Sequence, residues 1–334
     1  GIDYVIYDKV RPNPTYEICE EVASLAKEKE AKAFMGIGGG SPQDTAKTAA
    51  ALLRYPDKKA KDLYEEIITM EDAAPIICIN TTHGTGTEVD HWAVAQCDGG
   101  FKPFMGGLPL YPIFSIDDPA LTKTLPLDQT ISTSLDALSH AFESATTTIR
   151  NPYCTVLSIE AARLTYRWLP IACVEPENIR ARYWLLYAAA IAGIAMDIAL
   201  THLGHASEHS LSALNPKIAH GTGLAAILPS VVKLTYRVLP EVCAEFFRPI
   251  IPDLEGKPRE AEYAAREVEG WSASIGRPEK LENLGFSKDD IPRLTENAWA
   301  WPTGKFVFRI SPVKVTKELI KSIFEESLEP LAKK

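Results

Sequence analysis

The sequence predicts an α/β domain followed by an all-α domain, and three observations support this fold class. Short apolar, strand-like runs alternate with helical periods over the first third of the chain. Glycine-rich turns directly follow two of those runs. From about Asp128 onward nearly every segment has helical periodicity, interrupted by prolines near positions 152, 170, 229, 240 and 302. We expect the boundary within residues 119–126, which gives domains of residues 1–122 and 123–334.

The elements of the first domain follow from its apolar runs and turn residues. Four runs are typical of strands, and they cover residues 2–7, 33–37, 75–81 and 113–116. Ile18, Val22 and Leu25 recur at helical spacing after the first run. A hairpin is expected over residues 94–101, with its turn at residues 98–100.

The helix after the second strand carries start signals. Ser41 is a suitable N-cap, Pro42 suits the first helical position, and Asp44 completes a capping pattern of the S-x-x-D type. The sequence therefore predicts a helix that begins where the glycine run ends.

Composition and charge narrow the class of protein. The 334 residues are 46% hydrophobic and 24% charged, and a net charge of −9 disfavours nucleic acid or an anionic membrane as a partner. Six widely spaced cysteines favour free thiols in a reducing compartment. The strand-like start indicates no secretory signal, and the longest apolar run, residues 184–196, is too short to span a bilayer. We therefore expect a cytoplasmic protein in which residues 184–196 form a buried helix.

Two glycine-rich turns are candidates for binding a nucleotide. Gly38, Gly39 and Gly40 lead into the predicted helix, where backbone N–H groups and the helix dipole favour a pyrophosphate. This run is not the G-x-G-x-x-G motif, and a tight structural turn explains it equally well. Residues 82–87 add hydroxyls and glycines at a neighbouring strand end, which favours the nucleotide hypothesis.

The histidines are the second chemical signal. Asp136 and His140 stand at i and i+4, which places a carboxylate and an imidazole on one face of a helix. Four further histidines fall within one short stretch, and they are His202, His205, His209 and His220. A single histidine is more often a hydrogen-bonded structural residue, so spacing alone leaves a metal site and a structural role as equal alternatives. No G-x-S-x-G motif is present, which disfavours a serine hydrolase.

Six segments together resemble the iron-containing (group III) alcohol dehydrogenases, and the similarity spans essentially the whole chain. They are residues 8–15, 38–47, 81–89, 118–119, 136–143 and 219–221. The most specific is the D-A-L-x-H-A-x-E pattern of residues 136–143. The resemblance implies a dehydroquinate synthase-like architecture, in which an α/β dinucleotide-binding domain and an all-α metal-binding domain enclose the site.

The resemblance also implies roles for individual residues. The metal ligands would be Asp136, His140, His205 and His220. The cofactor would contact Gly38, Gly39, Gly40, Ser41, Thr81, Thr82, Thr85 and Lys102, with Asp8 near the adenosine ribose. His209 would lie near the nicotinamide. In the expected reaction the alcohol proton would leave through His209 as the catalytic residue, or through a cofactor ribose hydroxyl.

Three features depart from the family pattern. The strand and helix that usually precede the segment starting at Ile2 are missing from this sequence. His83 stands where a small residue is usual, and Asp90 and His91 follow where Thr or Ser is common. We expect the last two features to alter the cleft near the nicotinamide.

The expected reaction is hydride transfer between a small primary alcohol or aldehyde and NAD(P), with a divalent metal polarising the substrate oxygen. The ligand set suits Fe²⁺, with Zn²⁺ as the alternative. Asp8 slightly favours NAD, whereas Lys9 and Arg11 could receive the phosphate of NADP. A dehydroquinate-synthase-like lyase using metal and NAD, and an inactive structural relative, remain alternatives. We expect a homo-oligomer, a dimer.

Overall fold

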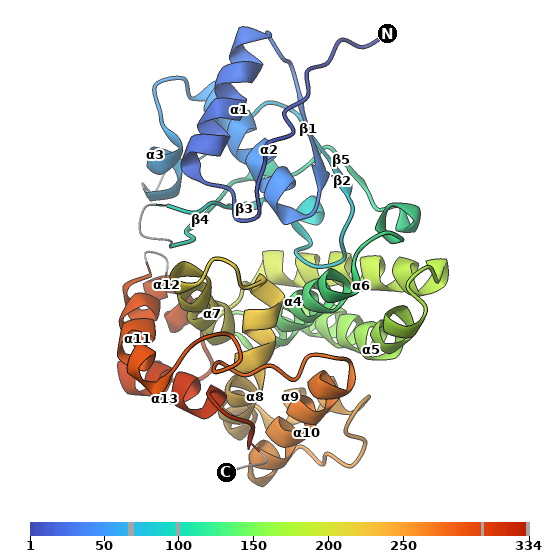
Figure 1. Cartoon of the computed structure of the whole chain (residues 1–334), viewed down its shortest axis with the longest axis vertical. Helices are drawn as coiled ribbons and strands as arrows, with labels where there is room; N and C mark the ends of the chain where they lie inside the picture. Colours follow the sequence, from blue (N-terminus) through green and yellow to red (C-terminus); the bar gives the residue numbers. More distant parts are fainter. Residues whose placement is uncertain (66–69, 98–100, 302–303, 332–334) are drawn as a thin grey trace.

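The computed structural model describes residues 1–334 except 66–69, 98–100, 302–303 and 332–334. An α/β region at the N-terminal end stands on a helical region that contains the C-terminus (Figure 1). The last strand ends at Ile116, and the first long helix of the helical region begins at Leu127. The predicted fold class is therefore confirmed. The domain limits of 1–122 and 123–334 stay a prediction.

A three-stranded parallel sheet organises the α/β region. β1 (Phe34–Gly38), β2 (Ile76–Asn80) and β5 (Phe114–Ile116) lie in the order β1-β2-β5. The carboxyl ends of parallel strands lie at one edge of a sheet, so the turns after β1 and β2 meet there. The Thr81 N–H donates to Gly38 O across this edge (3.1 Å), which joins the two predicted nucleotide turns.

Three helices accompany the sheet, and they are α1 (Tyr16–Glu28), α2 (Gly40–Arg54) and α3 (Ala60–Glu65). α2 packs against β1, and α1 packs against α2. The run of alanines at 49–51 is completely buried, because small side chains let α2 approach its neighbours closely. On β1, Met35 and Ile37 alternate with buried residues and are 53% and 57% exposed. The side of the sheet that carries them is therefore open to solvent.

The predicted hairpin is present, but it extends beyond the expected limits of 94–101 on both sides. β3 (Trp92–Val94) pairs antiparallel with β4 (Phe104–Gly106). The expected turn at 98–100 lies outside the described residues. Gly106 pairs with Trp92, and a Cβ at Gly106 would collide with the indole ring. The close approach of that ring thus explains the glycine.

The helical region consists of ten α-helices in the part of the chain that the structure describes. They are α4 (Leu127–Thr146), α5 (Pro152–Val174), α6 (Ile179–Ala199), α7 (Leu203–Leu214), α8 (His220–Val238), α9 (Pro240–Phe247), α10 (Ala261–Ser274), α11 (Ile291–Ala300), α12 (Gly304–Arg309) and α13 (Lys317–Ser327). Short 3₁₀ turns occur in both regions of the described chain. Those before the end of β5 are η1 (Thr87–Val89) and η2 (Leu108–Leu110), and those after it are η3 (Pro119–Thr122), η4 (Pro258–Glu260) and η5 (Lys288–Asp290). Pro170 and Pro229 lie inside helices rather than between them, so the breaks expected there are wrong, while position 302 is outside the described residues.

α4 is the central helix of this region. It packs against α5, α6 and α8, and every residue from Ser134 to Thr146 is buried. Because α4 is enclosed on all sides, a polar residue on it must find a partner inside the protein. α6, which contains the apolar run at 184–196, is the one described helix long and apolar enough to span a membrane. It packs against α4 and α5, and about half of it is buried, as expected of a core helix.

Two predictions about the N-terminal part are wrong. Residues 2–7 form no strand, and Ile2 and Ile6 are 91% and 72% exposed. The run has strand-like composition, but it pairs with no strand among the described residues, and ladder pairing is what defines a strand. The predicted N-cap is also misplaced, because α2 begins at Gly40 with Gly39 at the N-cap. Ser41 therefore lies in the first turn of the helix.

Candidate metal and cofactor site

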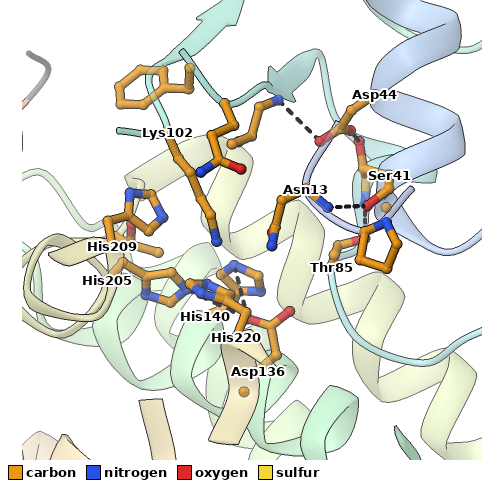
Figure 2. A pocket seen from close by; sticks show the side chains of 18 of the residues that line it. Asn13, Ser41, Asp44, Thr85, Lys102, Asp136, His140, His205, His209 and His220 are labelled. Atoms are coloured by element: carbon orange, nitrogen blue, oxygen red, sulfur yellow. Dashed lines mark hydrogen bonds and ion pairs between the residues drawn. The ribbon is translucent and has the colours of Figure 1, made fainter. Parts of the chain in front are cut away.

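A cavity of about 700 Å³ lies between the two regions and collects nine of the fourteen residues predicted for the site. From the α/β region these are Gly40, Ser41, Thr85 and Lys102, and from the helical region Asp136, His140, His205, His209 and His220. The other five, Asp8, Gly38, Gly39, Thr81 and Thr82, are not among its lining residues. Figure 2 shows the imidazoles and Asp136 together at one end and the Ser41 turn at the other.

Three helices bring the four predicted metal ligands together. Asp136 and His140 lie one turn apart on α4, whereas His205 lies in the first turn of α7 and His220 begins α8. The Nε2 atom of each histidine lies 3.7 Å from Asp136 Oδ1. Bonds of about 2.1 Å in a tetrahedral site place ligand atoms about 3.4 Å apart, so the spacing of the three histidines from Asp136 suits a metal. Asp136, His140 and His205 offer ligand atoms that all lie within 4.8 Å of one another.

The hydrogen bonding of the cluster is incomplete in a way that fits a metal ion. Asp136 Oδ1 and His205 Nε2 are buried and have no hydrogen-bond partner in the part of the chain that the structure describes. A buried polar atom without a partner costs free energy, and native proteins rarely tolerate one without a functional reason. The two orphaned atoms lie 3.7 Å apart, a separation at which one ion could bind both. The residues present therefore fit a divalent metal.

Burial and mutual charge set the protonation states in this cluster. Burial alone would raise the pKa of Asp136, but His140, His205 and His220 hold it below its usual range. Burial lowers the pKa of His140 to about 4. Burial also acts to lower the pKa of His205, yet Glu143 and Asp136 raise it, so a metal ion would have to displace a proton from this ring on binding. An ionised carboxylate and a neutral His140 are the forms that bind metals.

His209 and Lys102 flank the histidine cluster. The His209 ring lies 5.4 Å from that of His220 and packs edge-on against Trp301 at 4.6 Å. Burial lowers the pKa of His209 well below its usual range, and the charges of His220 and Lys102 add to this effect. Burial likewise lowers the pKa of Lys102, whose side chain is directed at the cluster in Figure 2.

The two predicted nucleotide turns touch each other through glycines. A Cβ at Gly40 would lie 2.7 Å from Thr85 Cγ2, and one at Gly39 would lie 3.0 Å from Thr82 Oγ1. Gly38 has a φ angle of +142°, a backbone conformation that residues other than glycine rarely adopt. The absence of side chains thus lets the α2 start and the turn after β2 come together. Asp8 is exposed and contributes nothing to this contact.

A buried ionic network that sequence reasoning missed shapes the second turn. Lys47 is completely buried and donates to Thr87 O (2.6 Å), Asp90 Oδ1 (2.8 Å) and Trp92 O (2.8 Å). Asp44 does not cap α2, because its carboxylate accepts from Thr87 Oγ1 (2.7 Å) and the Val94 N–H (3.0 Å). The signal was available, since Asp44 and Lys47 are one helical turn apart beside a polar turn.

His83 and His91, the two histidines that depart from the family pattern, join the regions. His83 Nε2 lies 3.0 Å from Arg182 Nη1, and its Nδ1 lies 2.9 Å from Ser134 Oγ on α4. Burial and the Arg182 charge lower the pKa of His83 to about 3. His91 Nδ1 lies 2.7 Å from Asp197 Oδ1 at the end of α6. Neither histidine lines the cavity, but Asp90, the other residue of this departure, does. The two histidines would therefore act on the nicotinamide side indirectly, and Asp90 could act directly.

Known proteins resemble this chain in both sequence and structure. Residues 1–119 match the iron-containing alcohol dehydrogenase family, and residues 130–328 match the C-terminal part of the Fe-containing alcohol dehydrogenase family. A long-chain primary alcohol dehydrogenase, AdhA of Thermoanaerobacter ethanolicus, is 51% identical over 328 residues, which cover 98% of this chain and 82% of that protein. The 1,3-propanediol dehydrogenase of Citrobacter freundii is 31% identical over 305 residues, with 89% and 77% covered.

Solved structures give the same result. The NADH-dependent butanol dehydrogenase A of Thermotoga maritima superposes with a TM-score of 0.88 at 27% identity, covering 98% of this chain and 84% of that one. These relatives are oxidoreductases, which disfavours both the lyase and the inactive relative. The chain therefore belongs to the iron-containing alcohol dehydrogenase family and is a metal-dependent, nicotinamide-dependent oxidoreductase of alcohols and aldehydes.

Proposed function

We propose that Asp136, His140, His205 and His220 hold one divalent metal ion at the bottom of the cavity. The support is the equal spacing of three Nε2 atoms around Asp136 Oδ1, together with the two orphaned polar atoms. Three imidazoles and a carboxylate bind either Fe²⁺ or Zn²⁺, and a carboxylate in place of a thiolate favours the harder Fe²⁺. When bound, the ion supplies Lewis-acid polarisation of the substrate oxygen.

The cofactor occupies the side of the cavity formed by the two glycine turns. Gly40, Ser41 and Thr85 line it, and the start of α2 offers free backbone N–H groups to a pyrophosphate. From there the nicotinamide would extend toward Lys102 and His209, which line the same cavity. We favour NAD over NADP slightly, since the family resemblance places Asp8 near the adenosine ribose, where its carboxylate would repel a 2′-phosphate.

The substrate we propose is a primary alcohol with an apolar chain. Phe104, Trp301 and Val307 line the cavity beside His209, and Met196 and Leu200 line it as well. Such a wall favours alkyl chains over polar substituents, because burying an unpaired polar group is costly. The name of the Thermoanaerobacter ethanolicus relative, a long-chain primary alcohol dehydrogenase, points in the same direction.

The side chains around the cavity would bind the reactants, exclude water and move the proton. Trp301 is 3% exposed and donates from Nε1 to Lys102 O (3.1 Å), which closes the cavity on that side. Burial holds the pKa of His209 well below its usual range, so its ring is neutral and a weak base that would pass the alcohol proton on rather than keep it. Among the described residues its Nδ1 has no hydrogen-bond partner, which leaves this atom free to take up that proton.

The observation that carries the proposal is the convergence of four ligand atoms inside a cavity that also contains the cofactor turns. The decisive experiment combines element analysis of purified protein with titrations of NAD and NADP and with turnover of ethanol, hexanol and 1,3-propanediol. We expect one equivalent of metal, tighter binding of NAD, and the highest kcat/KM for hexanol. Protein that turns over alcohols without bound metal would contradict the ligand assignment.

The cellular location and assembly are also proposals. Among the described residues all six cysteines are free thiols, which favours the reducing cytoplasm. The expected homodimer stays a prediction that light scattering of the purified protein would test.

A further inference from the structure

The three histidines of the proposed metal site differ in what their Nδ1 atoms contact. His205 Nδ1 lies 2.7 Å from Glu143 Oε1, and His220 Nδ1 contacts Glu208 Oε2. Among the described residues, His140 Nδ1 is buried with neither a hydrogen bond nor a carboxylate contact. A neutral imidazole has one N–H and one lone pair, so the partner of one nitrogen decides what the other can bind.

We propose that Glu143 and Glu208 are positioning residues that fix the ring orientation and tautomer of His205 and His220. Each carboxylate would accept the Nδ1–H of its histidine, so that the Nε2 lone pair faces Asp136. This inference rests on the proposed metal site and assigns work to two residues outside its ligand set. Carboxylates behind metal-bound histidines raise ligand basicity and hold the ring in place.

Glu143 is anchored on both oxygens. Its Oε1 accepts from the backbone N–H of His205 (3.0 Å) and also faces the ring of that residue. Its Oε2 accepts from the backbone N–H groups of His202 (2.5 Å) and Gly204 (3.2 Å). These N–H groups belong to the start of α7, where helical donors have no partner within the helix. Glu143 on α4 therefore caps α7 and orients its histidine at once, and it is 1% exposed.

Two glycines provide the space that the carboxylates occupy. A Cβ at Gly204 would collide with Glu143 Oε1, and one at Gly223 would lie 2.7 Å from Glu208 Oε1. Both are helical positions where glycine destabilises the helix by about 1 kcal/mol relative to alanine. Close approach of a carboxylate explains why the sequence keeps glycine there.

Glu208 is held less completely than Glu143. Its Oε1 accepts from Ser212 Oγ (2.5 Å), one turn later on α7, and Oε2 faces the His220 ring. The Glu208 side chain is completely buried, whereas 26% of the His220 side chain is exposed. Apart from the histidine, Glu208 thus has one side-chain donor, whereas Glu143 has three backbone donors.

This difference predicts unequal responses to glutamine. In Glu143→Gln one carboxylate oxygen is replaced by an NH₂ group. In either orientation of the amide this NH₂ group faces N–H donors, so either the contact to His205 or the contacts to the start of α7 are lost. In Glu208→Gln the amide can donate to Ser212 Oγ while its oxygen still accepts from His220. Metal affinity should fall about 10- to 100-fold in Glu143→Gln and Glu208→Ala, and less than about 5-fold in Glu208→Gln.

The test is the Kd for Zn²⁺ by competition with a chelator, measured together with the Tm of metal-free protein. Glu260→Gln is the matched control, because Glu260 also accepts from three backbone N–H groups, those of residues 255–257, but lies outside the metal-site cavity. It should lower Tm without changing Kd. A purely structural role would give Glu143→Gln the same behaviour.

The outcomes separate this inference from the proposed function. Wild-type Kd in both Glu143→Gln and Glu208→Ala, with metal still bound by the wild-type protein, would overturn the positioning role alone. A wild-type protein that binds no Zn²⁺ or Fe²⁺ would overturn the metal site and this inference together. Weaker metal binding by Glu143→Gln than by Glu208→Gln, at unchanged Kd in Glu260→Gln, would support it.

Discussion

The helical region and the α/β region build their sides of the cavity in different ways. On the helical side, functional side chains are buried and fixed by other side chains, as Asp136 (5% exposed) and His205 (4% exposed) are. On the α/β side, the cavity is shaped by backbone, because Gly39 and Gly40 touch the turn after β2 where side chains would collide. Removing a side chain should therefore impair binding on the helical side of the cavity, and adding a side chain should impair binding on the α/β side.

The largest effect is expected on the helical side. Asp136→Ala and His140→Ala should abolish both metal retention and activity, because each leaves the remaining ligands too few to hold the ion. Element analysis after dialysis measures the first effect, and NADH formation from hexanol the second. Stoichiometric metal with normal turnover in either variant would refute the ligand assignment.

His209→Ala separates binding of the metal from chemistry on the same side. The variant should retain its metal, since the four proposed ligands, Asp136, His140, His205 and His220, all remain in place. Its kcat should fall about 10²- to 10⁴-fold, as for the loss of a positioned proton carrier. Loss of metal in this variant would make His209 a ligand instead.

Gly40→Ala tests the α/β side by adding one methyl group. The new Cβ would lie 2.7 Å from Thr85 Cγ2, so the two turns must separate. Overpacking of this size costs about 1–3 kcal/mol, which corresponds to an increase of about 5- to 140-fold in the KM for NAD if the cost falls on cofactor binding. Metal content should not change. Equal losses of metal and cofactor binding would show that the two sides are not independent.

A buried histidine between the two regions predicts how stability depends on pH. His83 has a folded pKa of about 3, below its usual value, because of burial and Arg182. The unfolded chain therefore binds a proton that the folded chain rejects, and stability falls as pH drops from about 6.5 toward 3. Each pH unit in this window removes up to about 1.4 kcal/mol.

His83→Gln keeps an acceptor for Arg182 but cannot be protonated in this range. Urea unfolding at pH 7 and pH 5 should show a smaller loss of stability for the variant than for the wild-type protein. Parallel losses in the two proteins would mean that other groups, such as the buried His202, cause the acid sensitivity.

The smallest effect concerns cofactor choice. Asp8→Gly should raise the kcat/KM for NADP relative to NAD, since it removes a negative charge that would face the 2′-phosphate. Asp8 is exposed and does not line the cavity, so solvent screening limits the change to about 5-fold at most. A wild-type preference for NADP would show that Lys9 and Arg11 decide specificity.

The prediction of individual elements succeeded where the pattern was local. The turns after β1 and β2 lie at strand ends as expected, because glycine and hydroxyl residues mark chain reversals in any context. The strand at residues 2–7 failed because strand composition does not supply a pairing partner. Glu143 lay within the motif used for the resemblance, but its hydrogen bonds to α7 join residues 59 or more positions apart.

The sequence by itself determined the fold class, the two glycine-rich turns that follow β1 and β2, and the i, i+4 spacing of Asp136 and His140 on one helix. These follow from periodicities of a few residues, which local geometry enforces. Only the tertiary structure decided that His205 and His220 reach the same carboxylate oxygen, and that Glu143 and Glu208 face these histidines from behind. The physical reason is that packing of α4, α7 and α8 sets those distances, and no short-range pattern encodes how three helices pack.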